Sequence, residues 1–195
     1  LINSKEDPIV LFAKWFEEAK RKEVNDPNAM NLATISKNLN PSSRVVLLKS
    51  VSVNGFVFYT NIKSKKGKSI IYNPKVALNF YWKSLRRQVR IEGIAIKVSN
   101  KEADDYFKSR PKGSKIGAWA SQQSKQLNSR EELENKVNQF KQKYKDKIIP
   151  RPSYWMGFRV EPFLIEFWKE MPFRLHDRIQ YSIKENNWIV KRLYP

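Results

Sequence analysis

Apolar residues recur at helical spacing near the start of the chain, and short apolar or alternating runs fill most of the remainder. Asp7 followed by Pro8 is typical of a helix start. The apolar positions from Ile9 to Ala19 keep the 3.6-residue period, which predicts an amphipathic helix of about four turns. Ser99 and Ser129 begin segments with the capping-box pattern. Further helices are therefore predicted over residues 64–72, 99–107 and 129–144.

Short segments rich in β-branched and aromatic residues are typical of strands. They cover residues 31–36, 44–53, 56–60, 76–82, 88–98, 154–160, 164–168, 175–183 and 188–193. Asn54-Gly55 is favoured by type I′ turns and predicts a hairpin between its flanking strands. Because consecutive strands are joined by turns too short for crossover helices, a parallel sheet is disfavoured. The pattern predicts a mainly β (α+β) fold, an antiparallel barrel or sandwich with helices packed outside.

The composition is that of one soluble domain over residues 1–195. Hydrophobic residues at 41% exclude a disordered chain, and no apolar run reaches the roughly 18 residues of a membrane span. The absence of cysteine excludes a thiol nucleophile, and a single histidine argues against a zinc or iron site, so no metal is expected. A cysteine-free chain fits a reducing compartment, and we expect a cytoplasmic protein. The polar start predicts no signal peptide, and the lack of Met leaves open a segment before Leu1.

A formal net charge of +19 favours anionic partners such as nucleic acid, a membrane surface or phosphorylated small molecules. Much of this charge is lysine, which is normally solvated on protein surfaces. The six glycines form neither G-x-G-x-x-G nor a P-loop. Any phosphate must therefore be held mainly by side chains rather than by a glycine-rich loop.

Cations near segment ends are candidates for holding phosphate. Arg44 and Lys49 are five residues apart, so on an ideal strand they leave opposite faces and need not bind the same anion. Strand ends that simply reach solvent are an equally good interpretation. Residues 63–68 place four lysines and a serine at a helix start, which indicates either a bound anion or a solvated basic turn. Residues 106–114 supply a phenol, a guanidinium and a hydroxyl, which suit a phosphate clamp where a helix runs into a rigid turn.

The only histidine lies in a charged cluster of five residues, 174–178. If this stretch is extended, Arg174, His176 and Arg178 project from one face, while Leu175 and Asp177 point the other way. Two guanidiniums and an imidazole on one face suit a planar or anionic ligand. A lone histidine is more often structural, and these residues alone leave both interpretations open.

Taken in order, these segments resemble the pyridoxine (pyridoxamine) 5′-phosphate oxidase family over about residues 7–195. Each motif is weak by itself, but their order and spacing are specific. The matching motifs are Arg44-Val-Val-Leu-Leu-Lys49, Gly55-Phe-Val-Phe-Tyr-Thr-Asn61, Arg87-Gln-Val-Arg-Ile-Glu-Gly93, Tyr106-Phe-Lys-Ser-Arg-Pro111, Ile116-Gly-Ala-Trp-Ala-Ser121 with Gln123-Ser124, Ile165-Glu-Phe-Trp168 and Arg174-Leu-His-Asp-Arg178.

The resemblance implies an antiparallel Greek-key split β-barrel that binds FMN and works as a homodimer, with two flavin sites at the subunit interface. The residues that it assigns to FMN are Arg44, Val45, Val46, Leu47, Leu48, Lys49, Tyr59, Thr60, Lys65, Lys66, Gln88, Gln123, Ser124, Trp168 and Arg178. Those that suit the flavin phosphate are Arg44, Lys65, Lys66 and Ser124, and Gln88 suits an edge of the ring. The substrate residues that it assigns are Lys49, Tyr106, Arg110 and Ser114 for the phosphate, with Arg174 and His176 for the pyridine ring.

The implied activity is oxidation of pyridoxine or pyridoxamine 5′-phosphate to pyridoxal 5′-phosphate. A hydride passes from the substrate to flavin N5, and O2 reoxidises the flavin to give hydrogen peroxide. The expected catalytic residues are Arg174 and His176, in positioning and charge-stabilising roles. Two departures stand out. Lys65 replaces the family's usual arginine and loses its bidentate geometry, and nothing before Asp7 matches the family's basic, tyrosine-containing lid.

Two other functions remain open from the sequence. A flavin reductase or another split-barrel FMN oxidoreductase would keep the fold and cofactor but change the substrate. A nucleic-acid-binding β-barrel would use the +19 charge and the many aromatic residues. We favour the oxidase and expect neither nucleic acid nor membrane as a partner, because the informative cations are isolated rather than gathered in basic tracts.

Overall fold

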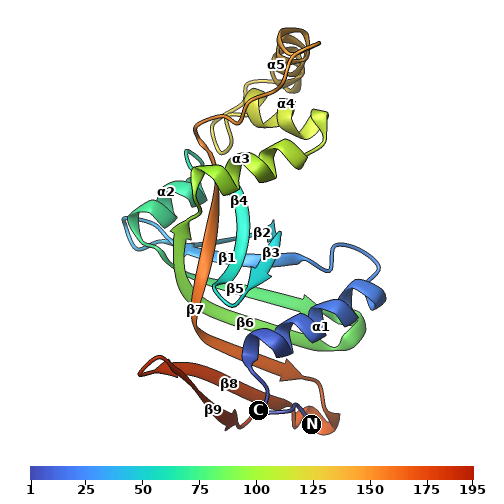
Figure 1. Ribbon diagram of the computed structural model, residues 1–195, viewed down its shortest axis with the longest axis vertical. Helices are drawn as coiled ribbons and strands as arrows, with labels where there is room; N and C mark the ends of the chain where they lie inside the picture. The colour runs from blue at the N-terminus through green and yellow to red at the C-terminus, as the bar shows by residue number, and fades with distance from the viewer.

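The computed structural model describes all 195 residues, as one curled antiparallel sheet of nine strands with five α-helices around it (Figure 1). The strands are β1 (Ala29–Ile35), β2 (Pro41–Leu47), β3 (Ser50–Ser52), β4 (Gly55–Asn61), β5 (Lys75–Trp82), β6 (Arg87–Lys97), β7 (Trp155–Lys169), β8 (Asp177–Lys184) and β9 (Asn187–Leu193). The helices are α1 (Pro8–Lys22), α2 (Lys65–Tyr72), α3 (Asn100–Ser109), α4 (Lys112–Ala120) and α5 (Arg130–Lys143), with short 3-10 turns at Lys83–Leu85 and Pro172–Arg174. None of the helices is both long and apolar enough to cross a membrane.

Strand β7 organises the sheet. It pairs with β6 along its length, with β4 through its first half and with β8 through its second half. The strand order is therefore β2-β1-β5-β6-β7-β4-β3, and β8 and β9 extend the sheet from the second half of β7. In Figure 1, helices α3 to α5 lie at one end of the molecule and β8 and β9 at the other. The antiparallel barrel-like sheet with outer helices confirms the predicted fold class.

The sequence predicted two strands, 154–160 and 164–168, where the structure has the single strand β7. Pro162 lacks an N–H, but it does not end the strand, because the pairing with β6 shifts register between Glu92 and Gly93, opposite this proline. Gly93 permits the close approach, since a Cβ there would lie 2.4 Å from a backbone oxygen of β7. An irregularity in pairing thus accommodates a residue that normally interrupts strands.

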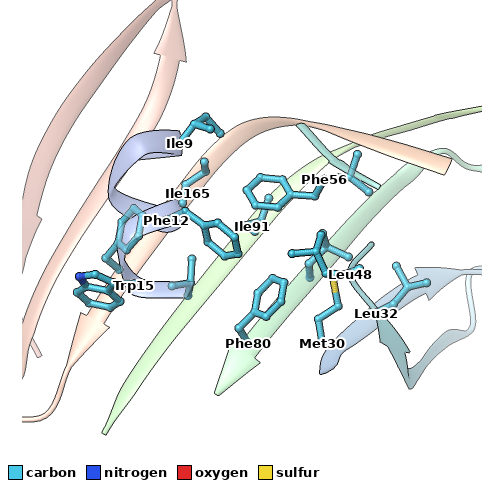
Figure 2. Close-up of a cluster of buried hydrophobic side chains, with 14 of the residues drawn as sticks. Ile9, Phe12, Trp15, Met30, Leu32, Leu48, Phe56, Phe80, Ile91 and Ile165 are labelled. Atoms are coloured by element: carbon cyan, nitrogen blue, oxygen red, sulfur yellow. The ribbon is translucent and has the colours of Figure 1, made fainter. Parts of the chain in front are cut away.

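Helix α1 packs against the sheet and completes the main core (Figure 2). Asp7 caps it as predicted, by accepting two backbone N–H groups of the first turn at 2.9 and 3.1 Å. Phe12 is fully buried and meets Phe56 and Phe80 edge-on, with ring centroids 4.8 and 5.1 Å apart. These contacts fasten the N-terminal helix to β4 and β5.

The predicted helices correspond to α1, α2, α3 and α5, each with a side-chain cap. Helix α4 is a difference, because a rigid turn was expected after residue 110. Its N-cap is Pro111, which offers no side-chain acceptor, so the usual signal of a helix start is missing. The helix is fixed instead by packing, with Ile116 buried against Phe107 in a second core cluster.

The segment 44–53, predicted as one strand, is divided into β2 and β3. Leu48 interrupts it by turning into the core, where only 3% of its surface is exposed. Its N–H donates to the carbonyl oxygen of Asn28 at 2.8 Å rather than continuing the ladder of β2. Burial of one apolar side chain therefore decides where the strand ends.

The hairpin predicted from Asn54-Gly55 is confirmed as β3–β4, but the predicted turn is wrong. Its two turn residues are Val53 and Asn54, and Gly55 already belongs to β4. Gly55 adopts φ +120°, and a Cβ on it would lie 2.1 Å from a backbone oxygen of β7. The glycine serves close backbone packing rather than a type I′ turn.

Two helical glycines should respond oppositely to alanine. In Gly67→Ala the new Cβ would lie 2.5 Å from the Cα atom of Ile62, so we expect a loss of about 1–3 kcal/mol in unfolding free energy. In Gly113→Ala the Cβ meets nothing within 4 Å, and we expect a gain of about 0.4–1 kcal/mol. Urea denaturation measures both; equal changes would contradict the packing of α2 against the chain before it.

Candidate active site

A cleft of about 740 Å³ lies among β2, β4, α3 and α4. Four cations line it, and no carboxylate does. Such a lining suits a ligand that carries more than one anionic group, at a volume typical of small-molecule sites. The predicted residues that line this cleft are Arg44, Val45, Val46, Leu47, Lys49, Tyr59, Thr60, Lys66, Tyr106, Arg110, Ser114 and Gln123.

Arg44 and Lys49 both line the cleft, although strand alternation predicted that they leave opposite faces. The prediction required a continuous strand from 44 to 49. Strand β2 ends at Leu47, so the alternation does not reach Lys49. The break at Leu48 is the physical reason for this difference.

The guanidinium of Arg44 is held only by neutral groups. It donates to the hydroxyl oxygens of Ser42 and Thr34 at 2.6 and 2.8 Å and to the carbonyl oxygen of Leu32 at 3.1 Å. Burial lowers the pKa of Arg44, because desolvation disfavours the charged form. No acid compensates this charge, so an anion in the cleft would meet an oriented cation.

Lys66 lies in the first turn of α2, which Ser64 caps by accepting the N–H of Gly67 at 3.2 Å. Its Nζ donates to Gln123 Oε1 at 3.0 Å and to Thr60 Oγ1 at 3.3 Å. Burial lowers the pKa of Lys66, and the nearby positive charge of Arg44 lowers it further. Two mutually repelling cations at a helix N-terminus make a site for a dianionic group such as a phosphate monoester.

Arg110 follows the last turn of α3 and also lines the cleft. Its Nη1 is buried and has no hydrogen-bond partner, and its guanidinium lies 4.7 Å from the ring centroid of Trp155. Burial lowers the pKa of Arg110. No carboxylate pairs with this guanidinium, and Arg110 lines the cleft with Tyr106 and Ser114, so the three are suited to hold a second phosphate.

The remaining aromatic and charged site residues form a second cluster outside the cleft. Gln88 pairs with Trp168, and Trp168 pairs with Arg178, so the three lie abreast on β6, β7 and β8. The His176 ring centroid is 4.6 Å from that of Trp168, and Nδ1 of His176 accepts the N–H of Met171 at 3.3 Å. Figure 1 places β8, which carries Arg178, at the end of the molecule away from α3 and α4.

The predicted extended face of Arg174, His176 and Arg178 is wrong. Phe173 and Arg174 have φ of 59° and 62°, and β8 begins only at Asp177. Positive φ at two successive residues turns the chain, so strand alternation does not apply before 177. The structure brings His176 to Trp168 through this turn instead. Asp177 does point inward, where it accepts the N–H of Ile2 at 2.6 Å.

Arg178 is fixed by Glu166, a carboxylate with only 3% of its side chain exposed. Its Nε and Nη2 donate to Glu166 Oε1 at 2.9 and 2.8 Å, and its Nη1 donates to the carbonyl oxygen of Tyr194 at 3.0 Å. Arg90 bonds the other carboxylate oxygen at 3.1 Å. Glu166 is a supporting residue that sequence reasoning missed as such, although it lies within one of the matching motifs.

Three predicted cofactor residues lie outside both clusters. Leu48 is buried in the core, Lys65 is exposed at the start of α2, and Ser124 lines a smaller hollow beside Gln123. Cleft residues that were not predicted are Asn61, Ser109, Pro111, Gly117, Ala118, Ser121 and Trp155. Most of these lie in α4 or at its ends. The apolar spacing within α4 was the signal that could have revealed this helix and, with it, these residues.

The fold and this cleft define a split-barrel protein. The structure resembles a pyridoxamine 5′-phosphate oxidase-related, FMN binding protein from Nostoc punctiforme PCC 73102, with a TM-score of 0.78, 14% identity and coverage of 97% of this chain and 99% of the other, a likeness in fold alone. It also resembles PhzG from Burkholderia lata 383, solved with tetrahydrophenazine-1-carboxylic acid, with a TM-score of 0.94, 29% identity and coverage of 100% and 98%.

Sequence comparison identifies the family within the split-barrel class. Residues 16–144 match the family described as pyridoxamine 5′-phosphate oxidase, and residues 155–195 match the pyridoxine 5′-phosphate oxidase C-terminal dimerisation region. A pyridoxine/pyridoxamine 5′-phosphate oxidase from Bartonella quintana is 55% identical over 191 residues, which cover 96% of this chain and 92% of that protein. The chain belongs to the pyridoxamine 5′-phosphate oxidase family, as its motifs predicted.

Proposed function

We propose that the protein binds FMN and oxidises pyridoxine or pyridoxamine 5′-phosphate to pyridoxal 5′-phosphate. The observation that carries this proposal is a cleft lined by four cations and no carboxylate, in a chain whose 55% identical relative is named for that activity. FMN and the vitamer each bring one phosphate, which accounts for two groups of cations in one cleft.

The residues fit the two ligands separately. Arg44 and Lys66, which lack acid partners and converge near α2, are suited to the phosphate of FMN. Arg110, with its orphaned donor, and Lys49 are suited to the phosphate of the vitamer. Because a phosphate offers several acceptor oxygens, it would satisfy donors that the chain itself leaves unpaired.

We infer that each complete site needs two copies of the chain. Trp155 lines the cleft, whereas Trp168 belongs to the second cluster, and the two are separated by about 40 Å along β7 at the usual rise per residue. A two-fold dimer would set the second cluster of one copy against the cleft of its partner, with FMN between them. The match of residues 155–195 to a dimerisation region supports this arrangement.

FMN, when bound, supplies the hydride acceptor for the carbon that is oxidised, and O2 is the final electron acceptor. The chain supplies orientation. Because Nδ1 of His176 accepts a backbone N–H, the neutral ring carries its proton on Nε2, which is thus a donor for the substrate. Arg174 adds positive charge to the same turn. Both residues would position the pyridine ring, which is the role that the resemblance implies for them.

The structural similarity to PhzG, solved with tetrahydrophenazine-1-carboxylic acid, favours a second candidate function. In that function the protein would be an FMN oxidoreductase that acts on a tricyclic carboxylate. Such a substrate has no phosphate monoester. Arg110 and Lys49 favour the phosphorylated vitamer, because two cations match the double charge of a phosphate monoester better than the single charge of a carboxylate.

The activity itself is tested with purified protein supplied with FMN. We expect bound, yellow flavin and formation of pyridoxal 5′-phosphate from pyridoxine 5′-phosphate. Arg174→Ala and His176→Ala should lower kcat/KM by about 10²-fold or more, since orientation is lost, with flavin affinity nearly unchanged. A protein that stays colourless and inactive with added FMN would contradict the proposed function. Loss of flavin with unchanged turnover per bound flavin would contradict the roles of Arg174 and His176.

The shared site is tested by mixing two inactive variants. Arg110→Ala damages the cleft and Arg174→Ala damages the second cluster. Random pairing after co-expression should restore about a quarter of wild-type activity, because half the dimers are mixed and each holds one intact site. A mixture of Arg110→Ala with Lys66→Ala, both in the cleft, is the matched control and should stay inactive. Failure of the first mixture would show that a site is built from one chain.

A further inference from the structure

Three aromatic rings lie parallel in the wall of the cleft. Tyr59 and Tyr106 have centroids 4.2 Å apart, Tyr59 and Trp155 5.0 Å, and Tyr106 and Trp155 6.1 Å, with planes within 13° of one another. The guanidinium of Arg110 rests over Trp155 and also near the ring of Phe107, at 5.5 Å. Arg110 thus rests on Trp155 directly, and Tyr106 stacks on Tyr59, which in turn stacks on Trp155.

We propose that Trp155 is a positioning residue that makes the site selective for a phosphorylated substrate, by orienting Arg110 and Tyr106 toward the substrate's phosphate. The inference rests on the proposed function. Trp155 was not among the predicted site residues, and its assigned role is to act through Arg110 rather than on the reacting atoms.

The physical reason lies in how a guanidinium can be held. Arg159 and Arg151 are held by carboxylates, at 2.9 Å from Glu102 and 2.7 Å from Asp104. A carboxylate beside Arg110 would neutralise its charge and compete with a phosphate for its donors. An aromatic face instead attracts the cation through the ring quadrupole and leaves every N–H free. Stacking therefore orients Arg110 without weakening it as an anion receptor.

Trp155 is itself held firmly. It is 7% exposed, and its backbone carbonyl accepts a hydrogen bond of 2.8 Å from Arg151, which also pairs with Asp104 of α3. Gly157 leaves room for the stack, because a Cβ there would lie 2.6 Å from the ring of Tyr59. The platform and the helix that carries Arg110 are thus tied to each other.

The ring of Tyr59 also stays neutral. Burial raises the pKa of Tyr59 to about 12, with Glu102 nearby as a smaller cause, so the phenol remains protonated in the range where enzymes normally work. A phenolate in this position would attract Arg110 directly and compete with the substrate. The neutral stack keeps the charge of Arg110 directed to the cleft.

The experiment compares Trp155→Phe and Trp155→Leu in the FMN-loaded enzyme. We expect KM for pyridoxine 5′-phosphate and the inhibition constant of inorganic phosphate to rise about tenfold in Trp155→Leu and less in Trp155→Phe, which keeps an aromatic face. The kcat and the dissociation constant of FMN should change by less than about twofold. In an Arg110→Ala background, Trp155→Leu should leave the phosphate inhibition constant unaltered, since it acts through that guanidinium.

Trp119→Leu is the matched control. This tryptophan of α4 packs in the same cluster and donates Nε1 to a backbone oxygen at 2.8 Å, but it does not line the cleft. It should lower stability and leave phosphate affinity unchanged. Equal phosphate effects in the two leucine variants, or additive effects with Arg110→Ala, would overturn the proposal. If Trp155→Leu does not fold, Trp155→Met, which also lacks an aromatic face, carries the same comparison.

The outcomes separate this inference from the proposed function. A wild-type enzyme that neither oxidises pyridoxine 5′-phosphate nor is inhibited by phosphate removes the proposed function and the inference with it. A wild-type enzyme that does both, with Trp155→Phe and Trp155→Leu kinetically unchanged, removes the inference alone.

Discussion

The continuous pairing of β7 with three neighbouring strands is the constraint on which the rest of the structure depends. One strand of 15 residues carries Trp155 at its first position and Trp168 near its last. Backbone hydrogen bonds to β4, β6 and β8 hold both ends in place. Since a paired strand cannot fold back on itself, the cleft and the second cluster stay apart in one chain. This separation is the reason for proposing that a complete site needs two copies of the chain.

Arginine side chains with carboxylate partners have structural roles, whereas those of the cleft are free to bind a ligand. Arginines with carboxylate partners, such as Arg151, Arg159 and Arg178, fasten elements to one another or orient a neighbouring side chain. Arg44 and Arg110, which lack such partners, line the cleft and rest on hydroxyls, carbonyls or an aromatic face. The net charge of +19 alone does not distinguish between the many kinds of anionic partner. The absence of acids from one cleft is what makes the charge informative.

Local signals explain which parts of the fold could be predicted. Capping side chains such as Asp7 and Ser99 mark helix starts because they act on the adjacent turn, and those helices were found. The start of α4 at Pro111 has no such side chain, and its helical state depends on packing with distant residues. The end of β2 at Leu47 and the passage of β7 through Pro162 likewise depend on partners far away in sequence. Such features need the tertiary structure.

The candidate site, like the fold, could be predicted only in part from the sequence. Motif order identified twelve of the 19 residues that line the cleft, and the structure adds which of them lack partners, as Nη1 of Arg110 does. It also replaces the expected extended face with a turn at Phe173 and Arg174, whose positive φ values no residue type there foretold. Residue spacing can say which side chains belong together, but backbone conformation decides how they meet.

We propose that this cleft and the second cluster of a partner copy together carry out a flavin-dependent oxidation of a phosphorylated B6 vitamer. The most direct test is anaerobic addition of pyridoxine 5′-phosphate to the FMN-loaded protein while the visible flavin absorbance is recorded. We expect the absorbance to bleach in proportion to the pyridoxal 5′-phosphate formed and to return when O2 is admitted. A spectrum that remains that of oxidised flavin at saturating substrate would contradict it.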